Sequence, residues 1–348
     1  MEISAGKLWG LRRLADDAGR FKMTAIDQRP PIINLVKERR GLDHAPFTDV
    51  VAVKRALALA LAPHSSAVLL DPDYAYAQLI DAISPRQGVI HTLESHAVDD
   101  TPAGRRTAPI PDWSVAKIKR AGGDAVKLLV WYRPDADAAV CRHQEDLVRW
   151  VGAACRRYDL PFVLEMLLYP LAGDAGRADP LADPAVRPEL VLQTVRIFAA
   201  PEYAVDLFKL ESPLAAATLP APDAPAARDT QAWFEQMAEA AGRPWVMLSA
   251  GAGKEAFRRV LTYAYRAGAS GFLAGRAIWW PAFQRFPDLE AMAGELESDG
   301  VPYMRELCTL TDQLARPWSA HPAFGDGPRL AGAGEAFRRQ YLNFDSAG

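Results

Sequence analysis

Short apolar runs recur along the chain, each bounded by glycine, proline or a charged residue. Runs of this kind are typical of strands that are buried on both faces of a parallel sheet. Eight strands are predicted in this way, at residues 23–29, 66–73, 88–94, 125–132, 161–169, 205–213, 245–251 and 271–279. Their number and spacing suggest one repeated structural unit.

Apolar residues spaced three and four apart indicate amphipathic helices between these runs. Three such stripes are Val50, Val53, Leu57 and Leu61; Leu147, Trp150, Val151 and Ala154; and Phe257, Val260, Leu261 and Ala264. Thr48 is the predicted N-cap of the first helix, and Gly268 is the predicted end of the third.

Alternating strands and helices imply a parallel sheet with right-handed crossovers. Eight such units favour an α/β fold, a single (β/α)₈ TIM barrel, over an open doubly wound sheet. The open sheet is the alternative, but no G-x-G-x-x-G follows the first strand. We therefore assign residues 1–320 to one barrel and residues 321–348 to a C-terminal tail.

Two segments rich in Pro, Ala, Gly and Asp follow the fifth and sixth predicted strands, at residues 170–187 and 213–228. They fall on the side where a barrel carries its active site. We expect loops there, which serve either as part of a lid or only as spacers.

Composition narrows the classes of protein further. The chain has 348 residues, of which 50% are hydrophobic and 24% charged, with a net charge of -3. These values argue against a disordered chain and against a nucleic-acid binder that relies on a basic surface. No apolar stretch approaches the roughly 18 residues of a membrane span, and the first residues lack the apolar core of a signal peptide. Three cysteines without a CxxC motif suit a reducing compartment. We expect a cytoplasmic protein that binds neither nucleic acid nor membrane; whether it forms a homo-oligomer is left open.

Polar side chains occupy the C-terminal half of every predicted strand. They are Asp27, Asp71, Glu94, Lys127, Glu165, Lys209, Ser249 and Arg276. An unpaired charge inside a buried strand is costly, and the C-terminal end of the strands carries the active site of a TIM barrel. The set therefore indicates a site; the alternative is a group of ion pairs that closes the barrel mouth.

Two of these residues, Lys127 and Lys209, are lysines within strands. Alternation places Lys209 on the same face as Leu207 and Glu211. Burial and a second ammonium group would lower the pKa of Lys209, as an amine nucleophile requires, whereas Glu211 and Glu165 would raise it. The combination suits imine chemistry on a phosphorylated carbonyl compound, with a carboxylate to move protons.

The last two units indicate an anion site. Residues 249–253 (SAGAG) lead into a predicted helix at residues 254–267, and Gly275 precedes Arg276. Backbone amides, a helix N-terminus and a guanidinium group together bind phosphate, and barrels frequently hold phosphate after strands seven and eight. The alternative is that these small residues only turn the chain. GAGKE is not a P-loop, because Glu255 stands where Ser or Thr is required.

The six histidines show no HxH or HExxH spacing, so we expect no metal ion.

Across the eight strands, the chain resembles the class I tagatose 1,6-bisphosphate aldolases, a (β/α)₈ family that also includes sulfofructose-phosphate aldolases. The resemblance covers about residue 8 to residue 318. Its motifs are AIDQR, LLDPDY, DWSVAKIKRAGGDAVKLL, LEMLLY, VDLFKLESP, LSAG and GFLAGRAIW, in this order.

The resemblance implies a role for each matching residue. Lys209 matches the imine-forming lysine and Glu165 the acid/base carboxylate, and Asp27 and Lys127 match an aspartate and a second lysine that line the site. Arg29 and Glu94 are implied as substrate contacts. The anion-binding segments are matched by Ser249, Gly251, Gly275 and Arg276.

By this resemblance, the expected reaction is reversible cleavage of a ketohexose 1-phosphate with a 6-anionic group, without cofactor. Tagatose 1,6-bisphosphate would give dihydroxyacetone phosphate and a three-carbon aldehyde. The alternatives are 6-deoxy-6-sulfofructose 1-phosphate as substrate and, from a different class, a protein that senses sugar phosphates. Two departures from the family pattern bear on selectivity: Pro30 and Pro31 follow DQR and would stiffen the first loop, and His96 precedes an unusual DDTPAGRR segment.

Overall fold

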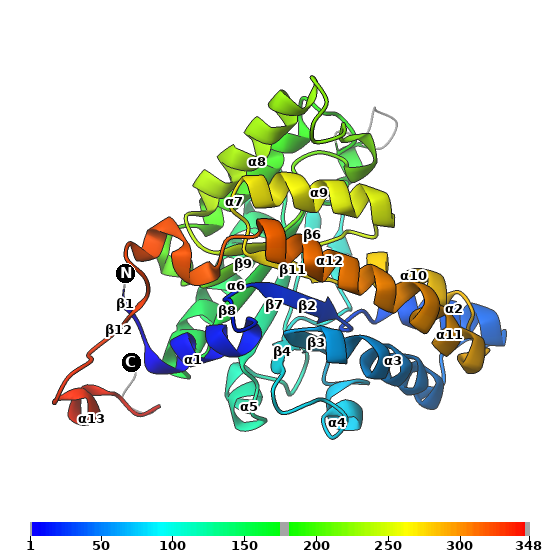
Figure 1. Cartoon of the computed structure of the whole chain (residues 1–348), viewed down its shortest axis with the longest axis horizontal. Helices are drawn as coiled ribbons and strands as arrows, with labels where there is room; N and C mark the ends of the chain where they lie inside the picture. Colours follow the sequence, from blue (N-terminus) through cyan, green and yellow to red (C-terminus); the bar gives the residue numbers. More distant parts are fainter. Residues whose placement is uncertain (1, 175–180, 345–348) are drawn as a thin grey trace.

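A closed barrel of eight parallel strands forms the centre of the computed structural model, which describes residues 2–174 and 181–344 (Figure 1). The barrel strands are β2 (Phe21–Ala25), β3 (Ala67–Leu70), β4 (Gly88–Thr92), β7 (Ala125–Trp131), β8 (Phe162–Leu167), β9 (Leu207–Leu210), β10 (Trp245–Met247) and β11 (Gly271–Ala274). Each pairs with the barrel strand that follows it in the chain, and β11 closes the barrel against β2. The predicted TIM barrel is thus confirmed.

Helices connect the strands and cover the outside of the barrel (Figure 1). They are α2 (Pro30–Arg40), α3 (Phe47–Leu61), α4 (Tyr76–Leu79), α5 (Val115–Arg120), α6 (Ala138–Arg157), α7 (Arg187–Phe198), α8 (Ala227–Ala241), α9 (Lys254–Arg266), α10 (Arg276–Phe283), α11 (Leu289–Glu295) and α12 (Val301–Leu314). Every predicted strand overlaps one observed strand, although β2 begins at Phe21, before the predicted range 23–29, and the helices fill the expected gaps.

Shorter elements complete the chain. A hairpin of β5 (Asp99–Thr101) and β6 (Gly104–Arg106) projects between β4 and α5. Single helical turns are η1 (Ala62–His64), η2 (Ala172–Asp174), η3 (Pro201–Tyr203), η4 (Ala216–Thr218), η6 (Trp318–Ala320) and η7 (Pro322–Phe324), and η5 (Leu296–Gly300) is a π-helical turn between α11 and α12. The DDTPAGRR segment noted in the sequence is this hairpin.

The eighth predicted strand, residues 271–279, is wrong in its second half. The strand ends at Ala274, and Arg276 begins helix α10. Apolar residues resume directly after Gly275 and Arg276, on the buried face of α10, so the apolar pattern alone does not mark the change. The backbone turns at Gly275, where a side chain would collide with the carbonyl oxygen of Ala25.

Three helix details also differ from the expectations. Helix α3 begins at Phe47 after Pro46, without a side-chain cap, so Thr48 is not its N-cap. Pro30 and Pro31 do not stiffen a loop; they form the first turn of α2, where a missing N–H removes no helical hydrogen bond. In α6 the buried stripe includes Val148 and Val151, whereas Trp150 is 52% exposed. The stripe predicted for α9 is buried, and that helix does end next to Gly268.

Two apolar layers hold the barrel. One lies between the strands and the surrounding helices. The other fills the lower half of the lumen, with Leu69, Ile90 and Leu273 among its members, and is closed from below by Leu11 and Trp318. Helix α1 (Ala5–Leu14) contributes Leu11 to this plug. The upper half of the lumen is left to polar side chains.

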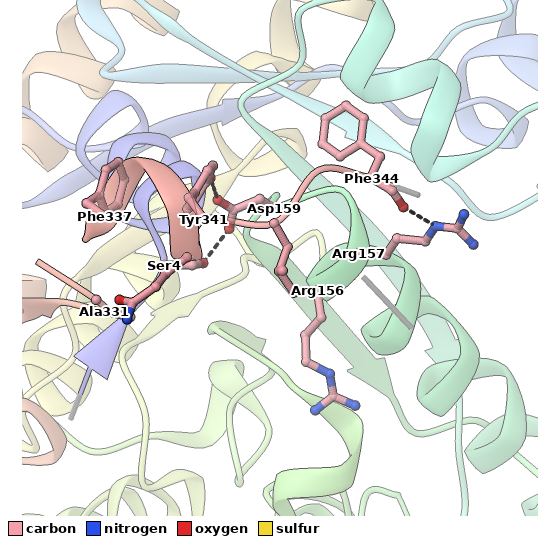
Figure 2. Close-up of a pocket in the computed structure, with 11 residues that line it drawn as sticks. Ser4, Arg156, Arg157, Asp159, Ala331, Phe337, Tyr341 and Phe344 are labelled. Carbon is pink, nitrogen blue, oxygen red and sulfur yellow. Dashed lines mark hydrogen bonds between the residues drawn. The ribbon is translucent and has the colours of Figure 1, made fainter. Parts of the chain in front are cut away.

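The C-terminal segment packs against the barrel's own N-terminal end. Strand β12 (Arg329–Leu330) pairs in parallel with β1 (Glu2–Ile3), and a final turn, α13 (Phe337–Gln340), follows. Figure 2 shows Ser4 and Tyr341 both directed at the carboxylate of Asp159. Residues 345–348 of the predicted tail and residues 175–180 of the predicted 170–187 loop lie outside the described residues.

Within the described part of the chain, no helix combines the length and the apolar character needed to cross a bilayer.

Candidate active site

Three adjacent strands direct charged side chains into the upper lumen. Lys127 lies in β7, Glu165 in β8 and Lys209 in β9, and Glu165 and Lys209 are register partners. Each follows, two residues later, an apolar lumen residue: Ala125, Val163 and Leu207. The strict alternation of a strand thus places the charges directly above the apolar plug.

Lys127 is the centre of the charged cluster. Its Nζ lies 3.1 Å from Asp27 Oδ2, 2.5 Å from Glu94 Oε1 and 2.9 Å from Glu165 Oε2. Its side chain is almost completely buried. Three carboxylates around one buried ammonium group compensate for the loss of water, which would be prohibitive for an unpaired charge.

Glu165 joins the two lysines. Its Oε2 atom, 2.9 Å from Lys127, also accepts a hydrogen bond of 2.8 Å from Lys209 Nζ. A buried amine therefore lies within direct proton-transfer distance of a buried carboxylate.

The charges shift the pKa values of their neighbours. Burial alone would raise the pKa of Asp27, but Lys127 and Lys209 outweigh it and lower the value to about 2. Burial also opposes ionisation of Glu165, yet the same two lysines lower its pKa. For Lys127, burial favours the neutral amine, whereas the three carboxylates raise its pKa well above the usual value. Asp27, Glu165 and Lys127 are thus ionised at neutral pH.

The resemblance implies Arg29 and Glu94 as substrate contacts, but most of their polar groups bind other residues of the protein. Arg29 Nη2 donates to the backbone oxygen of Glu94 at 2.8 Å, and its Nη1 lies 3.5 Å from Asp73. Glu94 binds Lys127 and accepts a 3.0 Å hydrogen bond from the Leu129 amide. Both residues still border the site, but their first role is to brace it.

Asp71 is not brought into the cluster, in contrast to the expectation for the strand ends. It is fully buried and forms an ion pair with Lys54 of α3. Its other oxygen accepts a 2.7 Å hydrogen bond from the Tyr74 amide. The chain turns immediately after β3, and this turn directs the carboxylate between the barrel and α3.

The predicted anion-binding residues do meet. Ser249, Gly275 and Arg276 border one cavity, and Gly251 lies beside the Arg276 guanidinium group. Ala250 and Gly251 have φ angles of 48° and 80°, so the loop after β10 turns in the left-handed region before α9 begins. Arg276 makes no hydrogen bond or ion pair with any described residue and remains available for a ligand.

Sequence reasoning missed three residues of the site. Arg187, at the start of α7, reaches the same cavity and lies 2.5 Å from Glu211. Gln28 and Trp131 border the site as well. Gln28 lies inside the DQR motif and could have been noted there, whereas nothing local distinguishes Arg187 at the end of a Pro/Ala-rich segment.

Two cavities of about 290 and 320 Å³ open at this end of the barrel. The first is bordered by the predicted anion-binding residues, and the second by Arg29, Pro30 and His96. Residues that line both are Gln28, Trp131, Glu165, Leu167, Lys209 and Arg276. An extended ligand can thus pass over Lys209 with one end in each cavity.

The three carboxylates of the cluster converge on an ammonium group. Elsewhere in the described ranges, no group of three or more His, Cys, Asp or Glu side chains is arranged to hold a metal ion. A buried amine beside a carboxylate, next to the unpaired Arg276 guanidinium group, is suited to imine formation with an anionic carbonyl compound.

Known proteins resemble this chain along most of its length. Residues 22–280 match the family described as DeoC/LacD family aldolase. A tagatose 1,6-diphosphate aldolase of Listeria monocytogenes is 31% identical, over 91% of this chain and 95% of its own. Tagatose 1,6-diphosphate aldolase 2 of Enterococcus faecalis is 30% identical, over 94% and 100%.

Solved structures share the fold at lower identity. A fructose-bisphosphate aldolase from Plasmodium falciparum has a TM-score of 0.65 and 13% identity, covering 91% of this chain and 98% of its own. An archaeal fructose-1,6-bisphosphate aldolase, described with its catalytic Lys covalently bound to the carbinolamine intermediate of the substrate, has a TM-score of 0.56 and 17% identity, covering 87% and 98%.

Proposed function

We propose that this chain, which belongs to the DeoC/LacD family of aldolases, is a class I enzyme whose imine-forming residue is Lys209. The observation that carries the proposal is the 2.8 Å contact between Lys209 Nζ and Glu165 Oε2, at the place where the two cavities meet. As an aldolase, the protein makes and breaks a carbon–carbon bond, and an imine supplies the electron sink for that step.

In the proposed mechanism, Glu165 first accepts a proton from the Lys209 ammonium group. The free amine adds to the C2 carbonyl of the sugar. Glu165 then returns its proton to the carbinolamine hydroxyl, which leaves as water and gives a protonated imine. The C3–C4 bond then breaks, and its electron pair moves toward the imine nitrogen while the C4 hydroxyl gives its proton to Glu165 or Asp27. The aldehyde leaves. Protonation of the enamine carbon and addition of water release dihydroxyacetone phosphate and restore Lys209.

Lys127 supports these steps electrostatically. Its ammonium group lies within 3.1 Å of Asp27, Glu94 and Glu165, so it keeps three carboxylates close together around the reacting carbons. It also holds Glu165 in contact with Lys209. A fixed charge of this kind needs no reorganisation when the proton moves.

The substrate we propose is a ketohexose 1-phosphate with a second anionic group at C6. The 1-phosphate would bind in the first cavity, where Arg276 is unpaired and Ser249, Gly251 and Gly275 allow close approach. Tagatose 1,6-bisphosphate is the first candidate, because relatives at 30–31% identity carry the name tagatose 1,6-diphosphate aldolase.

One observation favours 6-deoxy-6-sulfofructose 1-phosphate as a second candidate. In the second cavity, Arg29 already donates to the Glu94 backbone oxygen and lies 3.5 Å from Asp73. A sulfonate carries one negative charge, whereas a phosphate monoester carries nearly two at neutral pH. A sulfonate therefore needs fewer free hydrogen-bond donors in the second cavity than a phosphate would need.

Borohydride trapping tests the mechanism. The protein is incubated with dihydroxyacetone phosphate, reduced and digested, and the modified lysine is identified by mass spectrometry. We expect the adduct on Lys209 and no adduct in Lys209→Met, while Lys254→Met, at the surface start of α9, is modified like the wild type. An adduct on another lysine, or loss of activity in EDTA, would contradict the mechanism.

A kinetic comparison separates the substrates. The values of kcat/KM are measured for the 1,6-bisphosphates of tagatose and fructose and for 6-deoxy-6-sulfofructose 1-phosphate under identical conditions. The highest value identifies the preferred 6-substituent and C4 configuration. Arg276→Ala should raise KM for all of them, because the 1-phosphate is common to the three compounds.

A further inference from the structure

A lysine that the proposed mechanism does not use lies directly behind the active site. Lys54 belongs to the buried face of α3 and has no solvent exposure. Lysine is almost never fully buried unless it is paired. Such a residue needs a reason beyond packing, since an apolar side chain would fill the same space more cheaply.

The partners of Lys54 lie on two different loops. Its Nζ donates to the backbone oxygens of Ile26 at 2.7 Å and Gln28 at 2.9 Å, and it forms an ion pair with Asp71. These three acceptors use all three hydrogens of an ammonium group. One side chain therefore ties the loop after β2 to the loop after β3.

The two carbonyl groups flank Asp27. Its Oδ2 lies 3.1 Å from Lys127 Nζ, and its Oδ1 is buried without a hydrogen-bond partner. Nothing among the described residues other than Lys127 holds the Asp27 carboxylate by a hydrogen bond, so its position depends on the backbone on either side.

We propose that Lys54 is a positioning residue: it fixes the backbone at Ile26 and Gln28 and so holds the Asp27 carboxylate against Lys127. Asp71 is the counter-charge that permits an ammonium group at this buried place. Asp71 is itself fixed, because its Oδ1 accepts from the Tyr74 amide at 2.7 Å. The consequence for turnover rests on the proposed function; the consequence for the backbone does not.

The expected effect is on turnover more than on binding. A displacement of about 1 Å in a catalytic group can lower the rate ~100-fold, so we expect kcat to fall roughly 10- to 100-fold in Lys54→Met. KM for the ketohexose bisphosphate should change less than about threefold, because the residues proposed to bind the 1-phosphate lie on the loops after β10 and β11.

A matched control is present at the other end of the barrel. Lys7 in α1 is also buried, and its Nζ lies 2.7 Å from Asp206, but neither residue is near the site. Lys7→Met should lower the melting temperature without changing kcat.

The double variant Lys54→Met/Asp71→Asn removes both buried charges and keeps an acceptor for Tyr74. It should recover stability while kcat stays low, because the Ile26 and Gln28 carbonyls remain unbound.

Hydrogen–deuterium exchange tests the anchoring without any substrate. Peptides that cover residues 21–36 should exchange faster in Lys54→Met and in the double variant than in the wild type or in Lys7→Met. Unchanged exchange there would overturn the proposal, as would wild-type kcat in the double variant or an equal loss of kcat in Lys7→Met. Should Lys54→Met fail to fold, the double variant decides. If the wild type forms no Lys209 adduct, the proposed function is wrong, but the exchange measurement still tests whether Lys54 anchors the backbone.

Discussion

At the scale of single residues, the buried titratable groups are handled in two ways. Lys127 and Lys54 each form an ion pair with a carboxylate, because an unpaired buried ion is prohibitive. His91 is handled differently. It points outward from β4 with no solvent exposure, packs on Tyr76 and Trp113 at ring-centroid distances of 4.3 and 5.7 Å, and has no hydrogen-bond partner on either ring nitrogen. It therefore belongs to the core and not to the barrel mouth.

His91 should make the protein sensitive to mild acid. Burial lowers its pKa from 6.5 to about 4. Above pH 6.5 the imidazole is neutral in both states; between pH 6.5 and 4 the unfolded chain takes up a proton that the folded protein does not. The free energy of unfolding should therefore fall by about 3 kcal/mol over this window.

Denaturant titrations at pH 7 and pH 4 measure this loss. His91→Phe keeps an aromatic ring at the site and should lose about 3 kcal/mol less than the wild type between the two pH values. His44→Phe, at an exposed position, should follow the wild type. Identical pH dependence in His91→Phe and the wild type would show that His91 is not the responsible group.

At the scale of elements, the loop between α6 and β8 organises the lower end of the barrel. Asp159 has a φ angle of 51° and accepts from the backbone amides of Gly6 and Lys7 at 2.6 and 3.3 Å. It thus caps helix α1 from a distant part of the chain. The same carboxylate receives Tyr341 of the C-terminal segment, as Figure 2 shows.

Asp159→Asn should separate these roles from catalysis. Asn tolerates the left-handed conformation but retains only one oxygen acceptor, so we expect the free energy of unfolding to fall by about 1 kcal/mol. Tyr341→Phe removes only the contact of the tail and should cost less, yet it should expose the segment after residue 330 to limited proteolysis. Neither change should alter kcat, and a marked loss of activity would connect the tail to the active site.

At the scale of the whole molecule, the barrel divides into an apolar lower half and a charged upper half that contains the proposed active site. Its integrity depends on closure between the last and first strands, where Gly271 pairs with Phe21. Gly271 has a φ angle of 150°, and a Cβ there would lie 1.9 Å from the Phe21 carbonyl oxygen. No other residue fits this junction without moving a strand.

Gly271→Ala should therefore destabilise the entire barrel by about 3 kcal/mol or more, through backbone strain and lost strand pairing. Thermal unfolding followed by circular dichroism measures the effect. Gly294→Ala is the control: Gly294 is exposed near the end of α11 with no atom within 4 Å of an added Cβ, and its replacement should be neutral or slightly stabilising. Equal melting temperatures for the two variants would contradict this account of closure.

The local pattern of the sequence was sufficient for the architecture and for the grouping of the charged side chains that form the proposed site. Buried parallel strands are recognisable as short apolar runs, and alternation within a strand is enough to group Lys209 and Glu165 with the residues of one face. The burial of Lys54 could also have been predicted from the sequence, since this residue lies four residues after Val50 on the same helical face. The change from strand to helix at Gly275 could not be predicted in this way, because both elements are largely apolar and buried.

Only the tertiary structure decided which charges meet. Lys127 and Asp27 are 100 residues apart in sequence, yet their side chains are in contact. Asp71 was equivalent to Asp27 by its position after a strand but turns away to Lys54. Arg187 reaches the cavity beside Ser249 and Arg276 from the start of α7. The physical reason is that a strand determines on which face a side chain lies, whereas the distances across the mouth depend on closure of the barrel and on where each loop turns.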